Sequence, residues 1–133
     1  MVIDTSALVA VLLGEPERDD FIGLLADAPD PLIGAATLVE ASIVMQAKTG
    51  DDGVGDLDDL LSALAVRVVA VDSAQAQVAR DAFSRFGKGR SPAALNLGDC
   101  FSYALAQTFD RPLLFKGDDF AQTDVMPAAN GSG

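Results

Sequence analysis

Short apolar runs alternate along the chain with longer segments in which apolar residues recur every three or four positions. The short runs predict buried strands at residues 2–3, 32–33, 66–71, 113–115 and 123–126. The longer segments predict helices at residues 7–13, after Pro16, at 36–48, from Leu57, at 74–86 and from Asn96. This alternation is typical of an α/β domain, with a mainly parallel central sheet of four to five short strands flanked by helices.

The length of the chain, 133 residues, predicts a single domain with a core of its own. Residues 1–127 are expected to form this domain, and residues 128–133 a disordered tail. The last three residues, Gly-Ser-Gly, are typical of a linker left by cloning. No apolar run is long enough to cross a bilayer, so we expect no membrane association.

Four carboxylates stand apart from the other acids because of their place in the predicted strands and helices. Asp4 and Asp118 follow predicted strands, Asp99 is the only charge inside a predicted buried helix, and Glu40 lies in the interior of another helix. Glu40 has no Lys or Arg three or four positions away. Simpler interpretations exist for two of them, since Asp4 is also a good helix cap and Asp99 lies where the helix dipole favours a negative charge.

The expected sheet brings these acids to one place. Ligand sites in parallel sheets lie beyond the carboxyl ends of the strands, where Asp4 and Asp118 fall and where the helices of Glu40 and Asp99 can begin. Two carboxylates about 5 Å apart repel by roughly 3 kcal/mol at an effective dielectric of about 20. A helix cap contributes only about 1 kcal/mol, which cannot offset several such pairs. A divalent cation among the acids therefore explains the pattern better than capping alone.

The composition narrows the chemistry further. The chain has no histidine and one cysteine, Cys100, which excludes Ser-His-Asp and Cys-His catalysis and ordinary zinc sites. Oxygen ligands of the kind that remain suit Mg²⁺ or Mn²⁺. A single cysteine also fits a reducing compartment, so we expect a cytoplasmic protein. The net charge of −11 favours a basic partner.

A local basic strip runs against this overall charge. It consists of Arg80, Arg85, Lys88 and Arg90, on the helix at 74–86 and the loop that follows it. One interpretation is a solvated helix face followed by a loop. The other is a set of phosphate contacts beside the helix of Asp99, which would suit RNA.

Several motifs of the chain resemble those of one family, the PIN-domain ribonucleases, and specifically the VapC-type toxins of bacterial toxin–antitoxin pairs. The motifs are Val2-Ile-Asp-Thr-Ser-Ala-Leu8, the helical Glu40, Asn96-Leu-Gly-Asp-Cys-Phe-Ser-Tyr-Ala-Leu-Ala106 and Leu114-Phe-Lys-Gly-Asp-Asp-Phe120. They lie in the family's order and span nearly the whole chain. The resemblance implies an endoribonuclease that depends on one or two Mg²⁺ or Mn²⁺ ions.

The resemblance also implies roles for individual residues. Asp4, Glu40, Asp99 and Asp118 would form the catalytic, metal-binding acidic quartet. Ser6 would support the quartet, and Asn96 would orient Asp99. Asp119 is a rival to Asp118, which is preferred here because it directly follows a glycine after the strand.

The family further implies a homodimer, and a larger hetero-oligomer when a basic, VapB-like antitoxin inserts a segment into the acidic cleft. Two alternatives remain open. A HAD-type phosphohydrolase also begins with an Asp after its first strand, but it needs a second Asp where this chain has Ser6. A non-catalytic PIN-fold binding module would bind no metal.

Overall fold

The computed structural model describes residues 1–129. The strands are β1 (Val2–Ile3), β2 (Leu32–Gly34), β3 (Arg67–Val69) and β4 (Leu113–Leu114). The helices are α1 (Thr5–Leu12), α2 (Arg18–Asp27), α3 (Ala35–Ala63), α4 (Ser73–Phe86) and α5 (Leu97–Phe109). Among these helices, none is both long and apolar enough to span a membrane.

The sheet has four strands in the order β3-β2-β1-β4, and every neighbouring pair is parallel. This confirms the predicted α/β class and parallel sheet. β1 occupies an interior position, with Val2 opposite both Leu32 of β2 and Leu113 of β4. Three strand predictions were too long. β3 covers only three of the six residues expected, and β4 ends at Leu114 instead of residue 115. Residues 123–126 form no strand, and only the next residue, Pro127, makes an isolated bridge with Leu113.

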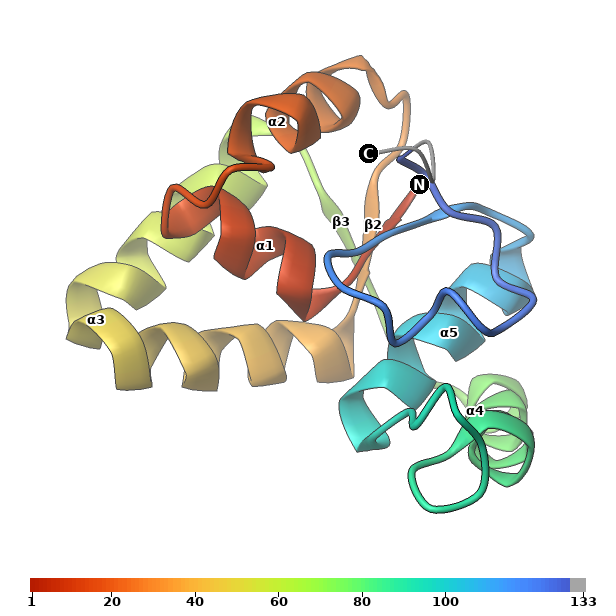
Figure 1. Ribbon diagram of the computed structural model, residues 1–133. Helices are drawn as coiled ribbons and strands as arrows, with labels where there is room; N and C mark the ends of the chain where they lie inside the picture. Colours follow the sequence, from red (N-terminus) through yellow and green to blue (C-terminus); the bar gives the residue numbers. More distant parts are fainter. Residues whose placement is uncertain (130–133) are drawn as a thin grey trace.

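Successive strand residues face opposite helical layers, as the period of a strand requires. Val2, Leu32 and Leu113 pack into the hydrophobic cluster that contains α5 and part of α4. Their neighbours Ile3, Ile33 and Leu114 pack into the cluster built from α1, α2 and α3. Figure 1 shows these two helical groups on either side of the sheet. Because both faces are covered, the strands are apolar throughout and their ends are the natural place for polar chemistry.

α3 is two helices joined without a loop. Gly50 has φ +71° and ψ −156°, which breaks the helical path two residues after the predicted end of the helix at 36–48. Residues 51–56, between the two helices predicted here, are themselves helical, so the second half begins at once. Figure 1 shows the resulting bend in α3. Only glycine adopts such a backbone without strain.

The end of the chain departs from expectation at one point. Ala128 donates a backbone hydrogen bond to the carbonyl of Leu113 at 2.8 Å, and Ala129 packs against the core. The tail predicted from residue 128 therefore starts too early, because these residues continue the contact with β4. The remainder of that predicted tail, residues 130–133, lies outside the described residues.

Candidate active site

Asp4 lies where β1 ends and α1 begins, and its side chain is only 3% exposed. The Asp4 backbone N–H donates to the carbonyl of Leu114, which fixes the residue at the carboxyl edge of the sheet. Its Oδ2 accepts from the backbone N–H of Ser6 at 3.1 Å, so Asp4 does cap α1. The predicted cap and the predicted site residue are thus the same side chain.

Two hydroxyls hold the Asp4 carboxylate. Ser6 Oγ donates to Oδ2 at 2.6 Å and Ser102 Oγ donates to Oδ1 at 2.5 Å. Ser6 Oγ also accepts from the backbone N–H of Lys116 at 3.0 Å, which ties the segment after β4 to Asp4. These bonds leave the carboxylate little freedom to rotate. Ser6 thus links Asp4 to the segment after β4, and its support of a catalytic site remains a prediction.

Asp99 lies in the first turn of α5 and is 9% exposed. It forms a capping box with Asn96: Asn96 Oδ1 accepts from the Asp99 N–H at 2.9 Å, and Asp99 Oδ2 accepts from the Asn96 N–H at 3.1 Å. These two bonds hold the Asp99 carboxylate against the start of α5. The pKa of Asp99 is raised to about 7, mainly by burial and further by the charges of Asp4 and Asp119, although the Asn96 backbone hydrogen bond opposes the shift.

Of the two acids after β4, Asp119 is the one that acts on Asp99, whereas the sequence led to a preference for Asp118. Asp119 raises the pKa of Asp99 through its charge and by hydrogen bonding to the protonated form. Asp118 instead lines a separate hollow of about 810 Å³, together with Glu17 and Asp19 of the α2 region. The turn at Gly117, with φ +99°, separates β4 from these two acids.

Glu40 lies one turn into α3 and is half-buried. Its Oε1 accepts a hydrogen bond from Thr5 Oγ1 at 2.5 Å, and its carboxylate lies against the backbone of Gly98. Thr5 and Gly98 are the sequence neighbours of Asp4 and Asp99. Glu40 therefore lies beside the segments that carry Asp4 and Asp99, while Asp4 and Asp119 act electrostatically on Asp99.

Positive charge does not account for this arrangement. Within residues 1–129, no ion pair joins Lys or Arg to Asp4, Glu40, Asp99 or Asp119. In the same range, no three acids are close enough to form a complete metal cluster. Mg²⁺ does not need one, since it is usually bound by one or two carboxylates, waters and substrate phosphates. The donor set, all carboxylate oxygens around a group whose pKa is raised, fits such a cation.

Comparison with known proteins identifies the family. Residues 1–126 match the PIN domain. The chain belongs to the PIN-domain family. A relative named Ribonuclease VapC, from Mycolicibacterium smegmatis, is 50% identical over 125 residues, which cover 94% of this chain and 97% of that protein. This PIN domain is thus similar to the VapC ribonucleases over nearly its full length.

Solved structures support the same fold. The structure of Mycobacterium tuberculosis VapC20, a sarcin–ricin loop cleaving toxin, has a TM-score of 0.77 at 16% identity, and 94% of this chain and 95% of that one are covered. A toxin–antitoxin complex from Klebsiella pneumoniae gives a TM-score of 0.70 at 19% identity, with 92% of each chain covered. The predicted single PIN-like domain is therefore confirmed.

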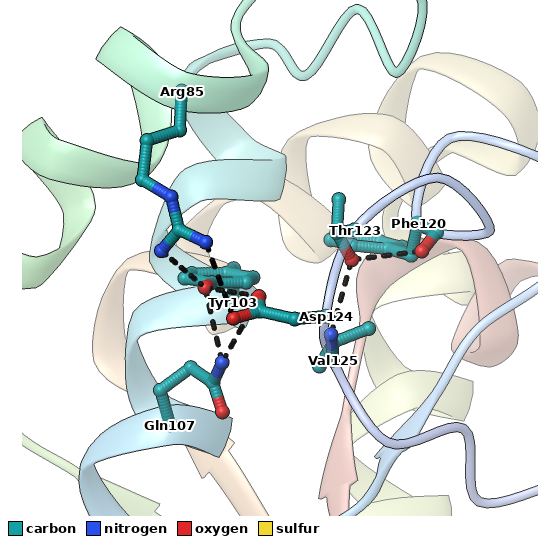
Figure 2. A network of polar contacts seen from close by, with 7 residues as sticks. All are labelled: Arg85, Tyr103, Gln107, Phe120, Thr123, Asp124 and Val125. Atoms are coloured by element: carbon teal, nitrogen blue, oxygen red, sulfur yellow. Dashed lines mark hydrogen bonds and ion pairs between the residues drawn. The ribbon is translucent and has the colours of Figure 1, made fainter.

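The basic strip of this PIN domain is exposed, but its members differ in their contacts. Arg85 Nη2 pairs with Asp124 Oδ2 at 3.3 Å, and Arg85 Nη1 donates to the Tyr103 hydroxyl at 3.4 Å (Figure 2). Arg80 donates only to Gln77 on its own helix, and Arg90 lies 6.0 Å from the centre of the Phe83 ring. Lys88 is exposed on the loop after α4. Their contact with RNA remains a prediction.

Three residues that contact the acids of the site were not predicted from the sequence. Ser102 lies three residues after Asp99, on the same face of α5, so helical spacing contained a signal for it. Thr5 directly follows Asp4, but a threonine after a helix cap is too common to single out. Gly98 precedes Asp99, and nothing in the sequence indicates that a carboxylate from α3 rests on it.

Proposed function

We propose that this PIN domain is a divalent-metal-dependent endoribonuclease and the toxin of a toxin–antitoxin pair. The observation that carries the proposal is the position of two buried carboxylates, Asp4 and Asp99, at the edge of a parallel sheet with Asp119 beside them. The relative that is 50% identical is named a ribonuclease, which supports RNA as the substrate. One or two Mg²⁺ or Mn²⁺ ions bound there would supply an activated water and neutralise charge on the attacked phosphodiester.

The residues of the chain have distinct parts in this proposal. Asp4, held by Ser6 and Ser102, and Asp99, held by Asn96, would present one fixed oxygen each to the cation. Asp119 and Glu40 would complete the quartet from the two flanking segments. We therefore place Asp119 in the fourth position, and Asp118 outside the site. Since the pKa of Asp99 is about 7, its proton leaves readily when a cation approaches.

RNA would approach this acidic edge with help from the basic strip. Of its members, Arg80, Lys88 and Arg90 have no ion pair within the described residues, so their charge is available for phosphates. Arg85 would first have to leave Asp124.

The proposal also includes a basic, VapB-like antitoxin as partner. The net charge of −11 gives such a partner a long-range attraction. The similar Klebsiella pneumoniae structure is of a toxin–antitoxin complex, which supports this type of assembly. We propose a homodimer that joins a larger hetero-oligomer with the antitoxin.

RNA cleavage by purified protein tests the proposal. The wild type should cut RNA with Mn²⁺ and stop when EDTA is added, and Asp4→Asn and Asp99→Asn should each be inactive while remaining folded. Asp59→Asn, an exposed acid on α3, is the matched control and should cut normally. Sequencing of RNA ends after brief expression, compared with Asp4→Asn, would locate the cut. Undiminished cleavage by Asp99→Asn would overturn the assignment.

The two alternatives make different predictions. A HAD-type phosphohydrolase would form a phospho-aspartyl intermediate at Asp4, but Ser6 stands in the place of the second Asp that this class needs and donates to Asp4 instead. A non-catalytic binding module would show no saturable Mn²⁺ binding. Saturable binding together with cleavage would exclude the second alternative.

A further inference from the structure

The Glu40 carboxylate occupies the space where Gly98 has no side chain. A Cβ placed on Gly98 would overlap Glu40 Oε2 and would lie 2.6 Å from Cδ and 2.7 Å from Oε1 of the same side chain. These three atoms are the nearest that such a Cβ would meet, and all belong to the carboxylate group. The first turn of α5 therefore contains a notch one side chain deep, and the tip of Glu40 fills it.

A hydroxyl fixes the other side of the same carboxylate. Thr5 Oγ1 donates to Glu40 Oε1 at 2.5 Å, and Thr5 is 9% exposed, so its side chain is confined. Thr5 is the first residue of α1 and Gly98 is the second residue of α5. Glu40 is thus held between the starts of two helices, whose dipoles favour a negative charge at that end.

We propose that Gly98 is a positioning residue for Glu40, with Thr5 as its counterpart on the opposite helix. The absence of a side chain at Gly98 lets the Glu40 carboxylate come beside Asp99, and the Thr5 hydroxyl selects its orientation. This inference rests on the proposed function, because it explains how the one acid that does not follow a strand or start a helix reaches the quartet.

The variant Gly98→Ala should change the position of Glu40 without preventing the protein from folding. Gly98 is helical and has an ordinary φ, so alanine fits the backbone and favours the helix. The group that alanine would displace is the end of a flexible side chain, which can rotate away at little cost. Gly98→Ala should therefore leave a folded protein in which Glu40 has moved out of the notch and lost its bond to Thr5.

The experiment is a double-mutant cycle with Gly98→Ala, Glu40→Ala and the combination, read by Mn²⁺ affinity in calorimetric titration. Gly98→Ala should weaken Mn²⁺ binding at least about tenfold, the usual cost of losing a group that orients a ligand. In the Glu40→Ala background it should cost nothing more, because the carboxylate it displaces is gone. Gly55→Ala, with open space at its Cβ, is the control and should bind Mn²⁺ normally.

Thr5 provides an independent arm. Thr5→Ser keeps the hydroxyl and should retain wild-type affinity, whereas Thr5→Val keeps the shape and should lose affinity about as Gly98→Ala does. If Thr5 had a purely structural role, Thr5→Ser and Thr5→Val proteins of equal melting temperature would bind Mn²⁺ equally well.

A crystal structure of metal-free Gly98→Ala tests the position of Glu40 independently of metal binding. Glu40 displaced from Thr5 would support it even if the wild type neither bound Mn²⁺ nor cut RNA, in which case the proposed function alone would fail. Glu40 still bonded to Thr5, or equal losses of affinity from Gly98→Ala with and without Glu40, would overturn the inference.

Discussion

The Tyr103 hydroxyl donates a hydrogen bond to Asp124 Oδ1 at 2.5 Å, which joins the middle of α5 to the segment after β4 (Figure 2). Tyr103 is buried, and Gln107 Nε2 donates to the same hydroxyl at 3.0 Å. Tyr103 and Arg85 lower the pKa of Asp124. Asp124 lies five residues after Asp119, so this bond anchors the segment that supplies the fourth acid.

Tyr103→Phe removes the anchor and keeps the ring, which packs on Phe86 with centroids 5.7 Å apart. The variant loses the bond from the hydroxyl to Asp124 and the two bonds that the hydroxyl accepts from Gln107 and Arg85. Because both donors also bond Asp124, the free energy of unfolding should fall by about 1–2 kcal/mol, or several degrees in Tm. Hydrogen exchange at the Val125 amide, which donates to Thr123 Oγ1, should become faster. Unchanged exchange would show that the segment is held elsewhere.

Asp119 and Asp118 form a matched pair of neighbours. Asp119→Asn should reduce RNA cleavage by at least about 100-fold, since loss of a metal ligand exceeds the loss of a group that only orients one. It should also lower the pKa of Asp99, followed by carbon NMR of the carboxyl group, because one of its raising charges is gone. Asp118→Asn should change neither. The reverse result would restore Asp118 to the quartet.

Ionisation of Asp99 should destabilise the metal-free protein. Its pKa is about 7 when folded, against 3.8 as the ordinary value, so the folded state holds the proton longer than the unfolded state. Stability should therefore fall as pH rises from about 4 to about 7, by up to about 4 kcal/mol, and stay low above that window. Urea unfolding in EDTA at several pH values measures this. Asp99→Asn should remove that part of the slope and be the more stable protein at pH 8.

Binding of Mn²⁺ should carry the opposite pH dependence. Below about pH 7 the cation has to displace a proton from Asp99, so affinity should drop by up to about tenfold for each pH unit. The rise in Tm caused by saturating Mn²⁺ should accordingly be larger at pH 8 than at pH 6. A rise in Tm that does not vary with pH would place the ion away from Asp99.

RNA affinity should depend on Arg80, Lys88 and Arg90 more than on Arg85. Replacing a free cation with alanine should lower the slope of log affinity against log salt by about 0.7 for single-stranded RNA. Arg85→Ala should change the slope less, because its ion pair with Asp124 competes with phosphate. Filter binding with inactive Asp99→Asn protein allows the measurement without cleavage. Equal slopes for all four variants would show that the ion pair with Asp124 does not reduce the contribution of Arg85 to RNA binding.

The sequence predicted the parts of the site that regular structure fixes. Asp4 could be singled out from the sequence because a strand end determines its position. Asp99 could be singled out because a buried helix tolerates few charges. Glu40 was found by the lack of a positive neighbour. Each of these arguments needs only the local pattern and the rule that parallel strands end at one edge.

The rest depended on contacts that no local pattern encodes. Which of Asp118 and Asp119 faces Asp99 is decided by the turn at Gly117, whose φ of +99° is a property of the folded loop. The bond from Ser102 to Asp4 joins residues 98 positions apart. Leu97 is an apolar residue in the first turn of α5, yet it is 74% exposed, which helical spacing alone does not predict.

The hydrogen bonds on Asp4 limit how its carboxylate could bind a cation. A carboxylate has about four lone-pair positions, and Ser6 and Ser102 engage three of them at Asp4. A carboxylate with one free lone-pair position can bind a cation through only one of its oxygens. Calcium takes roughly six to eight oxygens and often both from one carboxylate, whereas magnesium is smaller and keeps much of its water shell. In the proposed metal site, we therefore expect Asp4 to bind through one oxygen, which suits magnesium better than calcium.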